Sequence, residues 1–204
     1  TIGLGGGAAT LNLDDTELGF LSDGFTAITI GDAPDGSGAI EVDSSTFSDD
    51  VTIIGGPITI SGSLSVTGTT TLTAGGAVTI NADVASSDSA NITATDIAAA
   101  GQDVDIAAAV TVQSTGGSIT IAAGDDFSMA AGSVLNASTT ITVNIDSGDA
   151  DNGTGATADL GGTFTSGAGA TVNSASDNDT FNVVAMTAAT LTGAAGDDSF
   201  NVSA

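Results

Sequence analysis

The chain contains no Lys, Arg, His or Cys, and neither Trp nor Tyr occurs in its 204 residues. Its 25 acidic residues, all Asp except Glu17 and Glu41, give a formal charge of −25 at pH 7. Without basic side chains, no salt bridge can form between side chains, so counter-charge must come from cations of the medium. The charge also excludes binding to the phosphate backbone of nucleic acids.

The missing residue types remove most catalytic chemistry. Ser–His and Cys–His nucleophile pairs cannot form, and a polysaccharide lyase would lack its basic residue. Glycoside hydrolysis requires two carboxylates, which are abundant, but sugar-binding platforms normally use Trp or Tyr. We therefore expect a protein that is not an enzyme.

No apolar run is long enough to span a bilayer, and no signal peptide is visible, so we expect no membrane insertion. The chain begins at Thr1 and stops within a pattern, which we interpret as a processed product or part of a longer protein. The hydrophobic fraction of 41% allows a core to form despite the charge. Twenty-nine Gly and only Pro34 and Pro57 favour an all-β protein with many turns.

The commonest local unit is a triplet with two apolar residues flanking a small polar one. Such period-two alternation over so few residues predicts very short strands whose apolar ends point inward. The triplets are Ile28–Ile30, Ile58–Ile60, Leu64–Val66, Val78–Ile80, Val104–Ile106, Val110–Val112, Ile119–Ile121, Phe127–Met129 and Ile141–Val143.

Successive triplets are separated by short turns, which leaves no room for a helix between them. Ile58, Val78, Ile119 and Ile141 recur at about one or two times 20 residues, and we expect them to form one column. This spacing predicts a parallel β-helix with about 20 residues per rung, in one elongated domain over 1–204. Residues 1–50 would hold a helical turn and the first rungs, and 51–204 the regular rungs. A β-sandwich or jelly roll is the alternative, although its strands are usually longer.

The segment Leu11–Leu21 predicts a short helix near the N-terminus. Asp14 and Glu17 have the spacing of a capping box, with a carboxylate in place of the hydroxyl. We expect one or two helical turns that pack against a strand or cover one end, with Gly24 available to end the segment.

Three segments together resemble filamentous-haemagglutinin-type bacterial surface adhesins, which are large secreted proteins. They are Leu11–Leu18, Ala27–Asp32 and Gly38–Val42, and the later segments 75–80 and 116–121 look like repeats of the same proteins. The resemblance covers about residues 9–145 and implies a right-handed β-helix, secretion and a role in adhesion or surface layers. The loss of every basic residue departs from that family and argues against charge-based adhesion to polyanions.

The C-terminal segment Gly193–Asn201 is similar to the calcium-binding nonapeptide of repeat-in-toxin proteins, with Ala194 in place of the second glycine. Asp179 and Phe181 align with Asp198 and Phe200, which predicts that these residues stack on adjacent rungs. Since calcium takes six to eight oxygens, two stacked turns would be needed. We therefore predict calcium at Asp177, Asp179, Gly196, Asp197 and Asp198.

The alternative for these residues is a solvated acidic turn, in which Asp is present for its turn-forming chemistry. Weaker candidates for calcium are Asp49–Asp50, Asp125–Asp126, and the group Asp146, Asp149 and Asp151. The middle residues of four triplets, Thr59, Thr79, Thr120 and Thr142, could form an outward column that binds ice, or could simply suit half-exposed strands.

We expect a secreted structural protein at the bacterial cell surface, in an adhesin stalk or an extracellular fibre. Its copies would form a homo-polymer by end-to-end stacking, because solenoid ends leave strand edges unpaired. Contacts with a cell surface or matrix are further expected partners. The alternative functions are a calcium-dependent ligand-binding module for adhesion and an ice-binding solenoid.

Overall fold

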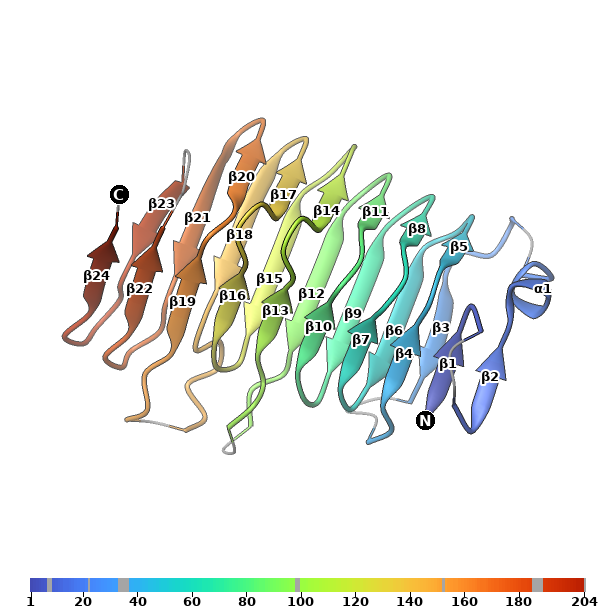
Figure 1. Ribbon diagram of the computed structural model, residues 1–204, viewed down its shortest axis with the longest axis horizontal. Coiled ribbons are helices and arrows are strands. Elements are labelled where there is room, and N and C mark those ends of the chain that lie inside the picture. Colours follow the sequence, from blue (N-terminus) through green and yellow to red (C-terminus); the bar gives the residue numbers. More distant parts are fainter. Residues whose placement is uncertain are drawn as a thin grey trace.

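The computed structural model is a parallel β-solenoid, with one short helix among the residues it describes, and the two termini lie at opposite ends of an elongated body (Figure 1). The structure describes residues 1–6, 9–21, 23–32, 37–97, 100–151, 153–184 and 189–203. Every pair of neighbouring strands is parallel, as in β7 with β10 and in β9 with β12. The alternative of a sandwich is therefore wrong, and the predicted solenoid is confirmed.

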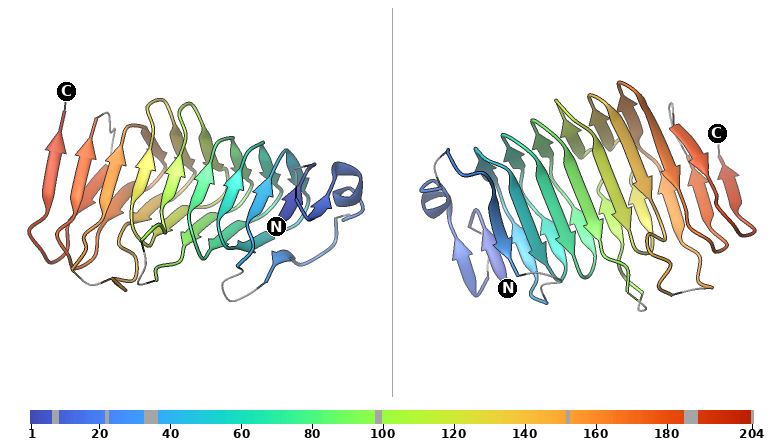
Figure 2. Two further views of the ribbon diagram at one scale, coloured as in Figure 1. Left: turned by 60° about the horizontal axis from the view of Figure 1, so that its bottom comes forward. Right: turned by 180° about the vertical axis from the view of Figure 1, so that it is seen from behind.

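Three sheets run along the body (Figure 2). Sheet A has ten strands in the order β2 (Leu11–Leu13), β1 (Ile2–Leu4), β4 (Ile40–Val42), β7 (Ile58–Ile60), β10 (Val78–Ile80), β13 (Val104–Ile106), β16 (Phe127–Met129), β19 (Thr157–Leu160), β22 (Thr180–Val183) and β24 (Ser199–Val202). Sheet B has eight, β3 (Ile28–Gly31), β6 (Val51–Gly55), β9 (Thr70–Ala74), β12 (Ala90–Ala94), β15 (Ile119–Ala123), β18 (Thr140–Asn144), β21 (Gly169–Asn173) and β23 (Ala189–Thr192). Sheet C has six, β5 (Ser45–Phe47), β8 (Leu64–Val66), β11 (Val84–Ser86), β14 (Thr111–Ser114), β17 (Val134–Ala137) and β20 (Thr163–Ser166).

A regular rung passes through sheet A, sheet C and sheet B before the next strand of sheet A begins. All nine triplets contribute to strands, and their apolar ends are buried while the middle residue is at least partly exposed. Since successive side chains of a strand point to opposite faces, each triplet places two apolar residues in the core. The core is thus a set of apolar columns along the inside of the solenoid.

The sequence-based column of Ile58, Val78, Ile119 and Ile141 is wrong. Ile58 pairs with Val78 in sheet A, whereas Ile119 pairs with Ile141 in sheet B. The predicted Thr column divides in the same way, with Thr59 beside Thr79 in sheet A and Thr120 beside Thr142 in sheet B. Similar triplets occur in every sheet of a rung, so spacing along the chain does not identify the sheet.

Rung length varies because one corner varies. In sheet A, Val78 follows its partner Ile58 by 20 residues, whereas Val104 follows Val78 by 26. The largest step, from Phe127 to Ala158, is 31 residues. Most of the additional residues lie in 95–103 and 145–156, where the chain turns from sheet B to the next strand of sheet A.

Helix α1 (Asp15–Leu18) forms as the capping box predicts. The Asp14 carboxylate accepts hydrogen bonds from the amides of Thr16 and Glu17, both at 2.9 Å, and the Glu17 carboxylate accepts from the Asp14 amide at 3.1 Å. The helix ends at Gly19, earlier than the Gly24 stop that the sequence allowed. It lies beside β5 and buries Leu18, so α1 covers the sheet C side of the N-terminal end.

Candidate metal centre

The turn from each strand of sheet B to the next strand of sheet A is the most acidic part of the solenoid. We call this line of turns the acidic edge. Its described acidic residues, from the β12–β13 turn onward, are Asp96, Asp103, Asp125, Asp126, Asp146, Asp149, Asp151, Asp177, Asp179, Asp197 and Asp198. Acidic pairs that are scattered along the sequence therefore lie on one edge because the rungs stack in register.

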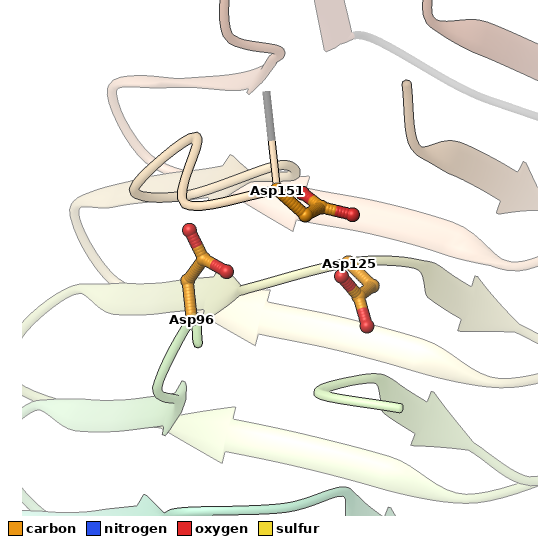
Figure 3. A group of neighbouring side chains, drawn as sticks. All are labelled: Asp96, Asp125 and Asp151. Atoms are coloured by element: carbon orange, nitrogen blue, oxygen red, sulfur yellow. The ribbon is translucent and has the colours of Figure 1, made fainter. Parts of the chain in front are cut away.

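Within the described ranges, two groups of three carboxylates converge on this edge. In the first cluster, one oxygen each from Asp96, Asp125 and Asp151 lies within 4.8 Å of the other two. These three side chains come from three different turns and point toward one another (Figure 3). Because each turn follows a different strand of sheet B, the cluster joins three successive rungs.

The second cluster consists of Asp146, Asp149 and Asp177, whose nearest oxygens also lie within 4.8 Å of one another. Asp146 and Asp149 come from the long turn after β18, which also supplies Asp151 to the first cluster. The two clusters are thus neighbours that share one loop. Asp146, Asp125 and Asp151 also line a common cavity of about 400 Å³.

Several acidic residues of this edge are held by backbone amides. One Asp125 oxygen accepts from the amides of Gly101 and Gln102, at 2.5 and 2.9 Å. One Asp96 oxygen accepts from the Ala150 amide at 2.6 Å, across 54 residues of sequence. These hydrogen bonds fix the side chains and leave the second oxygen of each carboxylate available for other contacts.

Burial leaves several of these oxygens without a hydrogen-bond partner. Among the described residues, such buried oxygens on the acidic edge are Asp96 Oδ1, Asp146 Oδ2, Asp149 Oδ1, Asp151 Oδ1 and Asp179 Oδ2. Asp146 is only 1% exposed and Asp179 is fully buried. A buried carboxylate without a partner is destabilising, so this edge requires a proton or a cation.

Burial and the crowding of like charges raise the pKa values of several carboxyls on this edge. Burial, followed by the charges of Asp179, Asp149, Asp177 and Asp151, raises the pKa of Asp146 to about 7. Burial and the neighbouring Asp177 charge also raise the pKa of Asp149. Farther along the cavity, burial is the main cause that raises the pKa of Asp103 and Asp126.

The residues predicted from the C-terminal motif divide between two places. Asp177 is a member of the second cluster, and the buried Asp179 is the strongest charged neighbour of Asp146. Asp197 and Asp198 lie one rung farther, where Asp198 accepts from the Asp179 amide at 3.0 Å. The alignment of the two turns is confirmed, because Phe181 and Phe200 are paired in register.

The backbone conformation of this C-terminal turn requires a glycine at Gly196. Its φ is +142°, and a side chain there would collide with the Asp177 carbonyl oxygen. Asp197 donates its amide to the Asn178 side chain at 2.7 Å. Among the described residues, Gly196, Asp197 and Asp198 belong to neither three-carboxylate cluster, so calcium at this outer turn stays a prediction.

The structure places the weaker calcium candidates in different surroundings. Asp125, Asp146, Asp149 and Asp151 all enter the two clusters, whereas Asp126 uses one oxygen to accept from the Thr157 amide at 2.7 Å. Asp49 and Asp50 lie in the turn between sheets C and B, away from the acidic edge. There they accept from the amides of Gly24 and Thr69.

Asp96 was missed by the sequence reasoning, because it belongs to no motif and its partners lie far along the chain. The available signal was the length of two turns, 95–103 and 145–156, which exceed the three-residue turns seen at 75–77 and 124–126. Both long turns contain Asp and Gly, and each contributes to the first cluster.

A family model described as repeats of unknown function (DUF5649) matches residues 26–88. The matched span begins just before β3 and ends just after β11, so it covers regular rungs and none of the clustered carboxylates. No curated protein and no solved structure matches the chain. Among the described residues, no helix has the length and apolar character needed to cross a membrane. The fold and this match together identify a repeat protein built as a parallel β-solenoid.

Proposed function

We propose that the chain is a secreted structural rod of the bacterial cell surface. It would serve either as a segment of a filamentous-haemagglutinin-like adhesin stalk or as the subunit of an extracellular fibre. In this role it has no enzymatic activity, and its mechanical element is the continuous set of stacked strands. The observation that supports the proposal best is the state of its apolar columns at the two ends.

One apolar column follows sheet A through all ten strands. It consists of Leu11, Ile2, Ile40, Ile58, Val78, Val104, Phe127, Ala158, Phe181 and Phe200, in the order of strand pairing. The central members are fully or almost fully buried, whereas Leu11 is 53% exposed and Phe200 is 48% exposed. The two outermost members of the column are therefore only about half covered.

The backbone supports the same interpretation. In the described part of the chain, β2 and β24 are the outermost strands of sheet A, and each has a partner on one side only. An edge strand presents a row of free amides and carbonyls that can pair with another strand. Val202, 76% exposed on β24, adds apolar surface at this edge.

Stacking the C-terminal rung of one copy on the N-terminal end of another would extend sheet A and cover both exposed column ends. Such a contact joins two different surfaces and repeats without closing, so it produces an open filament. Helix α1 contacts β2 as well as β5, but among the described strands β2 is paired only with β1, so its outer edge has no strand partner.

Sedimentation velocity and negative-stain electron microscopy test this proposal. The chain should form unbranched filaments as its concentration rises, and Val202→Asp should prevent them by placing a charge at the contact. Ser65→Asp is the matched control, because Ser65 is exposed on the outer face of β8, which has a strand partner on both sides. A wild-type chain that stays monomeric at millimolar concentration with calcium present would contradict fibre assembly.

A second candidate function comes from the outer face of sheet B. Its strands contain no acidic residue, although the chain carries 25. One line of outward residues in register is Thr29, Thr52, Thr71, Asn91, Thr120, Thr142, Thr171 and Thr190. A neutral, regularly spaced array of hydroxyl and methyl groups is suited to ordering water, which supports ice binding.

Freezing-point hysteresis measured on single ice crystals separates this candidate from the rod. An ice-binding face would give hysteresis that the double substitution Thr120→Lys and Thr142→Lys abolishes. Ser65→Lys, on the exposed face of sheet C, should leave it unchanged. Absence of hysteresis in the wild-type chain would remove the candidate and leave the structural rod unaffected.

A further inference from the structure

We propose that the acidic edge binds two calcium ions, one in each three-carboxylate cluster, and that they tie four consecutive turns of the solenoid together. Asp96 follows β12, Asp125 follows β15, Asp146, Asp149 and Asp151 follow β18, and Asp177 follows β21. The ions would thus act as staples along the rod. This inference concerns the middle of the rod and is independent of how its ends assemble.

The spacing of the carboxylates suits calcium. Calcium binds oxygen at about 2.3–2.6 Å, so oxygens on opposite sides of one ion are at most about 5 Å apart. The oxygens in each cluster lie within 4.8 Å of one another. Magnesium binds at about 2.0–2.1 Å and requires near-octahedral geometry, whereas calcium accepts the flexible geometry that carboxylates from three separate positions provide.

A buried and unpartnered carboxylate is the independent observation that points to an ion. Asp146 is 1% exposed, its Oδ2 has no hydrogen-bond partner among the described residues, and it lines the cavity beside the first cluster. Asp96 Oδ1, Asp149 Oδ1 and Asp151 Oδ1 are also buried without partners. A solvated acidic turn would expose these atoms to water, and the structure does not.

The clusters are organised in advance for a ligand. Asp96 in the first cluster and Asp177 in the second each hold one oxygen on a backbone amide, at 2.6 Å from Ala150 and 2.5 Å from Gly153. Both donors belong to the long turn after β18. Hydrogen bonds of this kind orient the ligands of metal sites and are needed for full affinity.

Gly148 permits the approach of Asp96 to this turn. Its φ is +132°, and a Cβ atom there would lie 2.6 Å from Asp96 Oδ2. Asp146 and Asp149 have φ values of 51° and 54°, which non-glycine residues rarely adopt. The turn is therefore wound into a tight form that brings Asp146 and Asp149 to one side and Asp151 to the other.

Two ions fit the charge better than one. The six carboxylates carry six negative charges when ionised, and the chain has no basic side chain to balance them. A single divalent ion in one cluster would leave the other three carboxylates uncompensated beside it. Two ions neutralise four of the six charges and leave a net charge of −2 across the pair.

The direct test is calcium stoichiometry by equilibrium dialysis at pH 8 in 150 mM NaCl, with the full chain first stripped by a chelator. We expect the two clusters to bind two ions per wild-type chain, with affinity in or above the range of extracellular calcium modules, about 10⁻⁴–10⁻³ M. Asp151→Asn and Asp149→Asn should each remove one of these two ions, and the double variant both. Each affected site should lose more than about tenfold in affinity, which even an outer-sphere change can cause.

Asp88→Asn is the matched control, because Asp88 is exposed in the turn between sheets C and B. It removes the same charge from another edge and should leave two ions bound. If Asp88→Asn lowers calcium binding as much as Asp151→Asn, the chain attracts only a diffuse cation atmosphere and the proposal is wrong. A wild-type stoichiometry of zero or one, or equal affinity for magnesium, would also overturn it.

Thermal unfolding of Asp146→Asn gives a second readout that a purely structural role would not produce. Without calcium, this variant should melt higher than the wild-type chain, because it removes a buried charge among other carboxylates. At 100 times the dissociation constant, calcium should raise the wild-type midpoint by about 5–10 °C per site. The Asp146→Asn variant should lose the part of this rise that comes from calcium in the second cluster. If Asp146→Asn lowers the midpoint without calcium, or keeps the full calcium gain, the assignment of Asp146 fails.

Discussion

Replacing the two stacked phenylalanines one at a time would show whether the C-terminal rung is an open end. The rings of Phe181 and Phe200 are 4.8 Å apart and nearly parallel, with an interplanar angle of 3°. Phe181 is fully buried, whereas Phe200 is 48% exposed. The two residues are neighbours in one column and lie opposite each other in the paired strands β22 and β24. They therefore differ mainly in how much of the ring is buried.

The expected magnitudes follow from this coverage. Phe181→Ala empties a closed core position and should lower the free energy of unfolding by about 3–5 kcal/mol. Phe200→Ala removes a ring that is about half covered, so burial contributes about 1 kcal/mol. Loss of the ring stack adds about 0.5–1.5 kcal/mol. The dilute monomer should therefore lose about 1.5–2.5 kcal/mol of unfolding free energy with Phe200→Ala.

Urea unfolding followed by circular dichroism measures the global effect, and hydrogen exchange of the β22 and β24 amides locates it. In a solenoid each repeat contacts only its neighbours, so Phe200→Ala should increase exchange in β24 and leave the central rungs protected. Under filament-forming conditions its effect should approach that of Phe181→Ala, because the ring would then be covered. Equal destabilisation by both variants in the dilute monomer would refute this reasoning.

Three further predictions concern other parts of the molecule. Because the folded chain keeps the Asp146 proton up to about pH 7 and the unfolded chain releases it near pH 4, the unfolding free energy of the calcium-free chain should fall as the pH rises from 4 to 7. Asp146→Asn should flatten this slope, which urea midpoints at pH 5 and 8 would show. The buried hydroxyls of Thr70 and Ser86 are 2.6 Å apart, so Thr70→Val alone should cost about 1–3 kcal/mol, whereas adding Ser86→Ala should recover most of it; a double-mutant cycle in urea decides. Asp14→Ala removes the cap of α1 and should cost about 0.5–2 kcal/mol, seen as faster hydrogen exchange confined to α1.

The strands could be predicted because the signal for them is local. The alternation within each triplet, such as Ile58–Ile60, is enough to predict which side chains face the core, and both end residues are buried in the structure. The α1 cap was equally local, since Asp14 and Glu17 are three residues apart. The assignment of triplets to sheets was not local, because it depends on how long each turn is.

The proposed cation site depends on the same nonlocal information. Asp125 and Asp151 were recognised only as weaker calcium candidates in two separate groups, and Asp96 was not recognised at all. Their convergence follows from the number of residues in two long turns and from a hydrogen bond between Asp96 and Ala150 that spans 54 positions. No short motif encodes such a contact, whereas the Asp179–Asp198 stack was visible because its two turns repeat a similar sequence.

The distribution of charge connects the proposed location with the proposed ions. Exposed carboxylates about 5 Å apart repel by roughly 1 kcal/mol in water, and salt at physiological strength screens charges beyond about 8 Å. Bulk salt screens Asp146 poorly, because the residue is 1% exposed among four other carboxylates. Its charge must therefore be removed by a proton or matched by a bound cation, and the raised pKa of about 7 means that the two compete near neutral pH. At neutral pH the ion prevails only where calcium is abundant. A rod cross-linked by calcium would consequently be more stable outside the cell than in a calcium-poor compartment. The hypothesis of secretion and the hypothesis of metal binding therefore support each other.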